Sequence, residues 1–508
     1  MLSFADAVNF AAAITLVCVG YVGVWRLIWS PLSKFPGPKL AALTLWYEFY
    51  FDVVRGGMYI WEIERLHKIY GPIVRISPHE LHVNDPQCYD DIYASSHRAR
   101  DKYTWQVKSG DSAQAMGFTV SHGLHRKRRQ AVDHFFSTQS VAKLEDSIHQ
   151  KIEKLCGRIE QYKKAQKPIN LTDAYLALTM DIVESYSFGV SSNLLEHPTF
   201  SSEWGTTITG IMSKTALLNH CGWIPKLIKL MPRRLVETIE PSLAMMNDMK
   251  EHVSQLINAV IERRARGDKA QYRTIFDNIM EDEELPAQEM TVARLTDEAT
   301  ILIIAASETP AKVLALITFH LLRRPDLVRK IREEVNGVTT TVSQRPSLSQ
   351  LEQLPYLSAV IKEGLRLHGG IVARSSRVCT SETLRIGTFD VPPGTPLSTS
   401  SYFIHRNPHL FPEPSQFLPE RWLVKDETRE LDRYLVAFGK GTRNCVGKNL
   451  GRAELYLALA TVLKTFDFEL FETDETDVEF GRDCGKRRRK FSYHNIEQII
   501  SIVLRILL

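Results

Sequence analysis

Closely spaced cysteines are missing from this sequence. Its seven cysteines lie far apart, at positions 18, 88, 156, 221, 379, 445 and 484, and no CxxC pair occurs among them. This spacing argues against a zinc knuckle and against a dense disulfide framework. A reducing compartment fits it best.

The sequence also lacks a strong excess of charge of either sign. It has 63 lysine and arginine residues against 59 aspartate and glutamate residues, a formal net charge of +4 over 508 residues. So small an excess does not indicate nucleic acid as a partner. Internal repeats and low-complexity linkers are absent from the sequence as well, so it offers no obvious place to divide the main body into domains.

One long uncharged run stands near the N-terminus. Ala7 to Trp25 contains nineteen residues without a charge, close to the ~20 that span a bilayer as a helix. We predict a membrane anchor over residues 1–30; the alternative, a cleaved signal peptide, usually has a shorter apolar region of about 7 to 15 residues. Arg26 and Lys34 follow the run and only Asp6 precedes it, which favours a cytosolic body.

Beyond this segment, apolar residues recur mostly every three or four positions. Stretches such as WEIERLHKIYG and KNLGRAELYLALATVLKTF predict amphipathic helices. Short runs typical of strands, such as PIVRISPHELHV and TLRIGTFDV, interrupt them. We therefore predict a mainly α fold with a minor β-sheet region, as one domain over residues 31–485.

Cys445 lies in the stretch FGKGTRNCVG, among glycines and basic residues. Gly441 and Gly447 allow a tight turn and a close approach to a bulky group. Lys440 and Arg443 favour the thiolate over the thiol. A buried structural thiol, a nucleophile and a metal ligand all remain open from the residues alone, although no local pattern identifies the base that a nucleophile needs.

The stretch resembles the haem-binding loop FxxGxRxCxG of the cytochrome P-450 family at every fixed position, namely Phe438, Gly441, Arg443, Cys445 and Gly447. The resemblance implies that Cys445 is the axial thiolate ligand of haem iron and that Phe438 shields its sulfur. It also implies that Arg443 pairs with a haem propionate and that Gly447 lets the next helix approach the porphyrin. An anionic sulfur donor favours O–O cleavage.

Two further stretches are similar to motifs of that family. EGLR places Glu363 and Arg366 on one helix face, where residues three apart meet. The same spacing occurs at Glu62 and Arg65, for which we expect a solvated surface pair. PERW lies between EGLR and the cysteine, as in the family, where its arginine, here Arg421, joins Glu363 and Arg366 in a buried structural network.

LHRKRRQ carries basic residues where helix C of the family usually has WxxxR. His125 and Arg129 occupy these positions, so histidine replaces tryptophan. The resemblance implies that both bind haem propionates, with Arg377 in SSRV as a third partner. The alternative is a basic, solvated helix.

AASETP, residues 305–310, resembles the oxygen-activation motif [AG]Gx[DE]T[TS] and departs from it at Ala306 and Pro310. The resemblance implies that Thr309 hydrogen-bonds the oxygen to be activated and organises water, and that Glu308 relays protons. Because proline has no N–H for the carbonyl of Ala306, we expect the helix to bend or open here.

The C-terminal residues depart from the family. The sequence ends in GKRRRKFSYHNIEQIISIVLRILL, which aligns with no segment of the family, and we assign residues 486–508 to an atypical basic and apolar tail. Contact with a membrane surface and an altered reading frame in the gene are both open explanations. The activity of this chain is therefore open as well.

Together, the resemblance implies a haem-thiolate monooxygenase, anchored once in the endoplasmic reticulum membrane, that inserts one oxygen atom from O2 into a lipophilic small molecule. Electrons would come from NADPH through a membrane-bound reductase that docks on basic residues near the cysteine. A haem-thiolate isomerase or dehydratase without reductase, and a haem-binding sensor, are the alternatives.

The substrate class follows from a narrower resemblance. GPIVRISPHELHVNDP and LHRKRRQAVDHFFS are similar to the trichodiene oxygenase type of fungal cytochrome P-450, a group rich in secondary-metabolite pathways. A terpenoid is therefore the first expected substrate class, and a polyketide or an alkaloid is the second.

Overall fold

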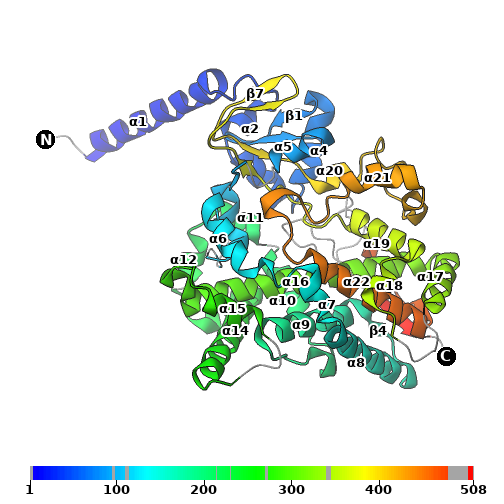
Figure 1. Ribbon diagram of the computed structural model, residues 1–508. Helices are drawn as coiled ribbons and strands as arrows, with labels where there is room; N and C mark the ends of the chain where they lie inside the picture. Colours follow the sequence, from blue (N-terminus) through cyan, green and yellow to red (C-terminus); the bar gives the residue numbers. More distant parts are fainter. Residues whose placement is uncertain are drawn as a thin grey trace.

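The computed structural model describes residues 4–93, 98–108, 112, 114–212, 214–228, 230–268, 273–338, 345–478 and 502–506. Helices dominate, and the strands are short. The prediction of a mainly α fold with a minor β-sheet region is therefore confirmed. Figure 1 shows the small sheet region and helix α4 (Tyr59–Tyr70) in the upper part of the molecule and the larger helical layer below it.

Helix α1 (Phe4–Val24) stands apart from the rest of the protein. None of its residues is buried, and Figure 1 shows it projecting away from the body. It continues into the π-helical turn η1 (Trp25–Trp29), and the combined segment is long and apolar enough to cross a membrane. Helix α16 (Val292–Leu322) meets the same test but is mostly buried, as befits a core helix.

Helix α16 is the centre of the helical layer, because most of its residues are buried, polar ones included. It packs most extensively against α9 (Leu171–Phe188), α14 (Pro241–Ala265), α19 (Pro355–His368) and α22 (Lys448–Thr465). The EGLR stretch lies on α19, and α22 follows Cys445. The packing around α16 therefore brings the sequence motifs together.

A five-stranded sheet forms the minor β region. Its order is β1 (Ile73–Arg75), β2 (Leu81–Val83), β8 (Pro396–Ser398), β5 (Arg377–Val378) and β3 (Asp101–Lys102). β2 and β8 run parallel, whereas the other neighbours are antiparallel. The register pairs Lys102 with Arg377, so this sheet brings two basic residues from distant parts of the sequence side by side.

The last described residues belong to the globular body. β10 (Val503–Ile506) lies between β4 (Ile169–Asn170) and β9 (Phe468–Leu470), antiparallel to both. Ile502 and Leu504 are fully buried. Part of the segment that the sequence assigned to a tail thus packs on the protein. The basic cluster Lys486 to Lys490 lies outside the described residues, and the domain boundary after residue 485 stays a prediction.

Candidate functional site

Cys445 lies in a tight loop before α22. The loop turns at Gly441, whose φ of 72° is in a region that side chains disfavour. The N–H of Cys445 donates to the carbonyl of Phe438 at 2.8 Å and closes the loop. Gly447 is the N-cap of α22, and a Cβ atom there would lie 4.0 Å from the Cys445 sulfur. The sulfur therefore sits directly beside the start of the helix.

The Cys445 thiol is deep in the protein yet retains accessible surface. Burial raises its pKa, while the N–H of Gly447 and the charges of Arg129 and Lys448 oppose this effect. The residue is nevertheless exposed, so Cys445 borders open space and is not packed on all sides. No described histidine or carboxylate hydrogen-bonds it, which argues against a nucleophile. A thiolate here needs a cationic partner in that space, as a bound iron would supply.

Cys379 has a different environment. It is 3% exposed and belongs to an apolar cluster around the sheet. Its sulfur accepts a hydrogen bond from Nη1 of Arg100 at 3.2 Å. Packed on all sides, Cys379 leaves no room for a planar group, and Cys445 is the cysteine that fits an iron ligand.

Four basic side chains gather near the loop: Lys102, His125, Arg377 and Arg443. His125 and Arg377 are buried, and the other two are half-buried. Burial and the charges of Arg377 and Arg443 lower the pKa of Lys102 to about 7. Burial, Arg443, Arg129 and Lys102 lower the pKa of His125 to about 3. Mutual repulsion and burial therefore make the positive charges of this cluster unfavourable unless an anion lies beside them.

The hydrogen bonds of this basic cluster go to neutral acceptors. Arg443 donates to the carbonyls of Arg100, Thr119 and Val120; Lys102 donates to that of Gly117; Arg377 donates to the carbonyls of Ser375 and Ser376 and to the hydroxyl of Ser375. Within the described residues, none of these three cations forms an ion pair with a carboxylate. Because buried like charges need a counter-charge, the cluster fits the two propionates of a haem.

Arg129 occupies a different place from the rest of the predicted propionate partners. It lies on α6 (His122–Asp133) and donates to both the carbonyl and the side-chain oxygen of Asn444, the latter at 2.9 Å. It also pairs with Asp133 at 2.9 Å. Arg129 thus holds the residue before Cys445, and its contact with a propionate stays a prediction.

The oxygen-activation stretch lies in the middle of α16, which continues without a break through Pro310. The helix therefore does not open here as the sequence led us to expect. The hydroxyl of Thr309 donates to the carbonyl of Ala305 at 2.7 Å. Ala305 is exposed although most of α16 is buried, which indicates that this part of the helix also borders open space.

Glu308 forms a buried ion pair with Lys312. Their charged atoms are 2.6 Å apart, and the two side chains are 7% and 9% exposed. No sequence motif singled out Lys312, although an acid and a base four residues apart on a helix are a known pairing signal. His368 lies close by, because the charge of Lys312 adds to burial in lowering its pKa to about 3.

Glu363 and Arg366 are fully buried and form a bidentate pair, with distances of 2.7 and 2.8 Å. Arg421 reaches Glu363 at 3.2 Å. Two more donors to this carboxylate were not evident from the motifs, namely Nε1 of Trp422 and the N–H of Leu418, each at 2.9 Å. Burial opposes ionisation, but these donors hold the pKa of Glu363 below its ordinary range.

This network reaches the segment before the cysteine loop through His405, whose Nε2 accepts from the N–H of Val436 at 2.9 Å. Arg366 donates to the carbonyls of His405, Pro414 and Gln416. After α19 the backbone of Gly370 has a φ of 65°, and a Cβ atom there would lie 2.2 Å from the carbonyl oxygen of Ala437. Only glycine fits so close an approach, which places the end of α19 against the residue before Phe438.

Comparison with known proteins agrees with this geometry. A profile of the family described as Cytochrome P450 matches residues 36–493. The chain is 40% identical to conidiogenone synthase PchP450 of Penicillium rubens, over 91% of this chain and 92% of that protein. This chain belongs to the cytochrome P450 family. It is also 36% identical to the monooxygenase TRI4 of Trichoderma arundinaceum, over 94% and 92%, and 37% identical to tryptophan 6-hydroxylase fscE of Fusarium equiseti, over 91% of each.

The protein is thus a cytochrome P450 monooxygenase with a haem-thiolate cofactor. The exposed Cys445 and the basic cluster without a carboxylate partner fit that group. No sequence motif singled out Lys102, and the structure adds it to this cluster. Its position depends on the pairing of β3 with β5, a tertiary contact that local sequence does not reveal.

The second pair with ExxR spacing in this cytochrome P450 lies on α4. Glu62 and Arg65 form a bidentate pair, with distances of 2.8 and 2.7 Å. The expectation of a solvated surface pair is wrong for Glu62, whose side chain is 6% exposed, and right for Arg65, at 57%. The hydroxyl of Tyr47 also donates to Glu62, which explains why this carboxylate tolerates burial.

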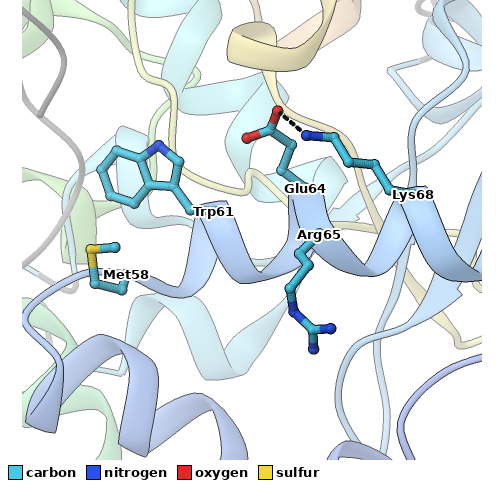
Figure 2. A pocket seen from close by; sticks show the side chains of 5 residues that line it. All are labelled: Met58, Trp61, Glu64, Arg65 and Lys68. Atoms are coloured by element: carbon cyan, nitrogen blue, oxygen red, sulfur yellow. Dashed lines mark hydrogen bonds and ion pairs between the residues drawn. The ribbon is translucent and has the colours of Figure 1, made fainter. Parts of the chain in front are cut away.

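A surface pocket lies along the same helix (Figure 2). Met58, Trp61, Glu64, Arg65 and Lys68 line it. Figure 2 shows Glu64 and Lys68 joined in an ion pair, with Arg65 pointing away from them. None of the candidate cofactor residues borders this pocket, so it is separate from the site around Cys445.

Proposed function

We propose that this cytochrome P450 inserts one oxygen atom from O2 into a C–H or C=C bond of a lipophilic small molecule, while the other atom leaves as water. A terpenoid of fungal secondary metabolism is the first substrate class. The similarity to TRI4 and the resemblance to the trichodiene oxygenase type support it. The haem, when bound through Cys445, supplies the oxygen activation.

The arrangement on α16 is the observation that carries this proposal. A monooxygenase must deliver protons to a water-poor centre, whereas a peroxide isomerase or a haem sensor needs no such path. Thr309 presents a hydroxyl beside exposed Ala305, and Glu308 directly precedes it. The ion pair with Lys312 holds the Glu308 carboxylate inside the helical layer. In this proposal, Thr309 orients water and Glu308 moves the proton.

Electrons come, in this proposal, from NADPH through a membrane-bound flavoprotein reductase. The basic residues around the cysteine loop are the docking surface for an acidic partner. Some of them are already paired, Lys440 with Asp90 at 2.8 Å and Arg452 with Glu352 at 3.1 Å. Lys448 forms no ion pair within the described residues, which makes it the more available contact.

The proposed location is the endoplasmic reticulum membrane, with α1 as a single anchor and the catalytic domain in the cytosol. Asn170 lies in an Asn-Leu-Thr sequon, but its side chain caps α9 by accepting from the N–H groups of Thr172 and Asp173. N-glycosylation of such a sequon takes place only in the lumen. The cytosolic orientation therefore predicts no mass shift on endoglycosidase treatment, and a shift mapped to Asn170 would reverse it.

The test of the proposed function uses microsomes that contain the full chain and a reductase. Incubation with NADPH and a panel of terpenes and polyketides, read by mass spectrometry, should yield a product heavier by one oxygen. Product formed from a hydroperoxide without NADPH would instead support the isomerase. The similarity to a tryptophan 6-hydroxylase favours an indole compound as the second substrate class, so tryptophan belongs in the panel.

A further inference from the structure

A surface pocket lies where the anchor segment meets the body, away from the site around Cys445. It has a volume of about 440 Å³, within the range of about 300 to 1,000 Å³ that is typical of small-molecule sites. The first residues after the anchor segment form one side, and the hairpin of β6 (Leu384–Ile386) and β7 (Phe389–Val391) forms the other. We call it the hinge pocket, and its lining includes Ser30, Pro31, Ser33, Lys34, Thr383 and Asp390.

The hinge pocket begins at the residue where the anchor segment ends. The segment Phe4–Trp29 is long and apolar enough to cross a membrane. Trp25 and Trp29 near its end are exposed, and tryptophan is enriched where a membrane meets water. Ser30 comes next, and its carbonyl accepts from the N–H of Ser33 at 2.9 Å, so a turn keeps the pocket residues close to the segment. In the proposed membrane location, the hinge pocket therefore lies in the headgroup layer, which is about 5 to 7 Å thick.

The end of the anchor segment is fastened to the body. Arg26 donates to the carbonyl of Leu43, and Arg75 donates to the carbonyl of Arg26, the latter at 2.8 Å. Phe35 is 5% exposed and stacks on Phe389 of β7, with ring centroids 5.2 Å apart. Figure 1 shows the β7 hairpin beside the end of α1. Because of these contacts, the hinge pocket has a fixed position relative to the anchor.

The hinge pocket presents one positive and one negative side chain. Nζ of Lys34 donates to the backbone carbonyl of Asp390 at 2.9 Å, and the Asp390 carboxylate takes no part in this bond. Neither side chain forms an ion pair within the described residues. Arg385 lies opposite Asp390 in the strand pair but does not line the pocket. The pocket therefore suits a ligand that carries a negative and a positive charge side by side.

We propose that the hinge pocket binds the headgroup of phosphatidylethanolamine, a phospholipid with both charges. The phosphate accepts from the Lys34 ammonium group, and the ammonium group of ethanolamine donates to the Asp390 carboxylate, so both contacts are charge-assisted. Exposed ion pairs are individually weak, but the anchor keeps lipids at a high local concentration around the pocket. The inference rests on the proposed membrane location and names the lipid that the protein binds there.

Native mass spectrometry of the full-length holoprotein, released from vesicles with a mild detergent, tests the proposal. The vesicles contain equal amounts of phosphatidylethanolamine, phosphatidylcholine and phosphatidylglycerol with the same acyl chains. We expect about five-fold more bound phosphatidylethanolamine than phosphatidylglycerol, a difference of about 1 kcal/mol, because the latter has no ammonium group. Phosphatidylcholine, whose ammonium group has no N–H, should lie between them. Equal binding of the three lipids, or a preference for phosphatidylglycerol, would overturn the proposal.

Two variants separate the two contacts. Lys34→Gln should lower the binding of all three lipids, because each has a phosphate. Asp390→Asn should remove only the preference for phosphatidylethanolamine. Lys39→Gln is the matched control, since Lys39 is exposed near the anchor but does not line the hinge pocket, and it should keep both the amount and the preference. A loss in Lys39→Gln as large as that in Lys34→Gln would assign the binding to general positive charge and overturn the site.

Two further measurements separate the source of the ligand from the proposed location. Soluble phosphoethanolamine at the same total concentration as the lipid should not displace it, and displacement would overturn the assignment to a membrane lipid. Extraction of microsomes with alkaline carbonate tests the location. A chain that carbonate releases would contradict the proposed location, whereas a chain that stays in the membrane without a lipid preference would contradict the lipid site alone.

Discussion

Two pairs with the spacing Glu-x-x-Arg, Glu363–Arg366 and Glu62–Arg65, lie in structurally different regions of this molecule. In α19, Glu363 and Arg366 are both fully buried. In α4, Glu62 is buried but Arg65 is 57% exposed. The distances between the paired atoms are nearly the same, so the local geometry of the helix does not distinguish the pairs. The two pairs differ in the number of other groups that form hydrogen bonds with them.

The Glu363 carboxylate accepts hydrogen bonds from Arg421, Trp422 and the N–H of Leu418. Arg366 donates to the carbonyl of the last residue of α20 (Ser401–His405) and to two carbonyls in the chain that follows it. Within the part of the chain that the structure describes, the Glu62 carboxylate accepts hydrogen bonds from Arg65 and Tyr47 alone. A buried charge is costly by itself, and its effect on the fold depends on how much of the structure it organises. The α19 pair reaches the segment before the cysteine loop, whereas the α4 pair supports its own helix.

The largest effect is expected for Glu363→Gln. It leaves Arg366 as a buried charge without its partner, which should cost about 3 to 5 kcal/mol of folding free energy. Chemical unfolding, together with the haem content of the purified protein, measures it. The same substitution at Glu62 is the control, and equal losses in both variants would break the comparison between the two pairs.

A smaller effect is expected for Trp422→Phe. This change keeps the aromatic ring but removes the N–H that donates to Glu363, a hydrogen bond to a charged group worth about 1.5 to 3 kcal/mol. Thermal unfolding of the variant should show the loss. Trp46→Phe, at a side chain that is 68% exposed, should leave stability unchanged. A similar loss of stability in that variant would mean that replacing any indole ring is destabilising, whether or not it donates to Glu363.

These contacts show how far the sequence alone leads. The motif predicted the Glu363–Arg366–Arg421 contacts, because i,i+3 spacing on a helix is local. It did not predict that Trp422 of the same PERW stretch donates to Glu363, or that Glu62 is buried, since both depend on which segments pack above the helix. The sequence did not reveal Lys102 as part of the basic cluster, because it lies beside Arg377 only through the pairing of two strands. It did not reveal the strand after residue 502 either, because nothing in the local sequence predicts the strands with which it pairs.

Acidification should affect both regions about equally. Burial lowers the pKa of His405, next to the α19 network, to about 3 and that of His67, on α4, to about 4. Both folded-state values lie below the unfolded value of about 6.5, so the unfolded chain binds more protons as the pH falls. Stability is present above pH ~6.5 and declines below it.

At pH ~5.5 each histidine should cost about 1.4 kcal/mol. Hydrogen exchange measured along the chain at pH ~7.5 and ~5.5 checks this. Protection of amides in α19 and α4 should fall together. If only α4 lost protection, the neutral state of His405 would not contribute to the stability of the α19 region, contrary to the account.

The smallest effect is expected for Arg65→Ala. Arg65 is mostly solvent-exposed, and exposed ion pairs contribute about 0 to 1 kcal/mol. Tyr47 remains to satisfy the Glu62 carboxylate. The midpoint of chemical unfolding should therefore barely move. A loss as large as that of Glu363→Gln would show that the exposure of Arg65 is a poor guide to its importance.

The most direct test of the account is the absorption of the reduced protein with carbon monoxide. If Cys445 is the thiolate ligand, the parent protein shows the red-shifted Soret band typical of thiolate haem, and Cys445→Ala loses it while Cys379→Ser keeps it. A Cys445→Ala variant that retained the band, or its loss in Cys379→Ser, would contradict the assignment on which the site rests.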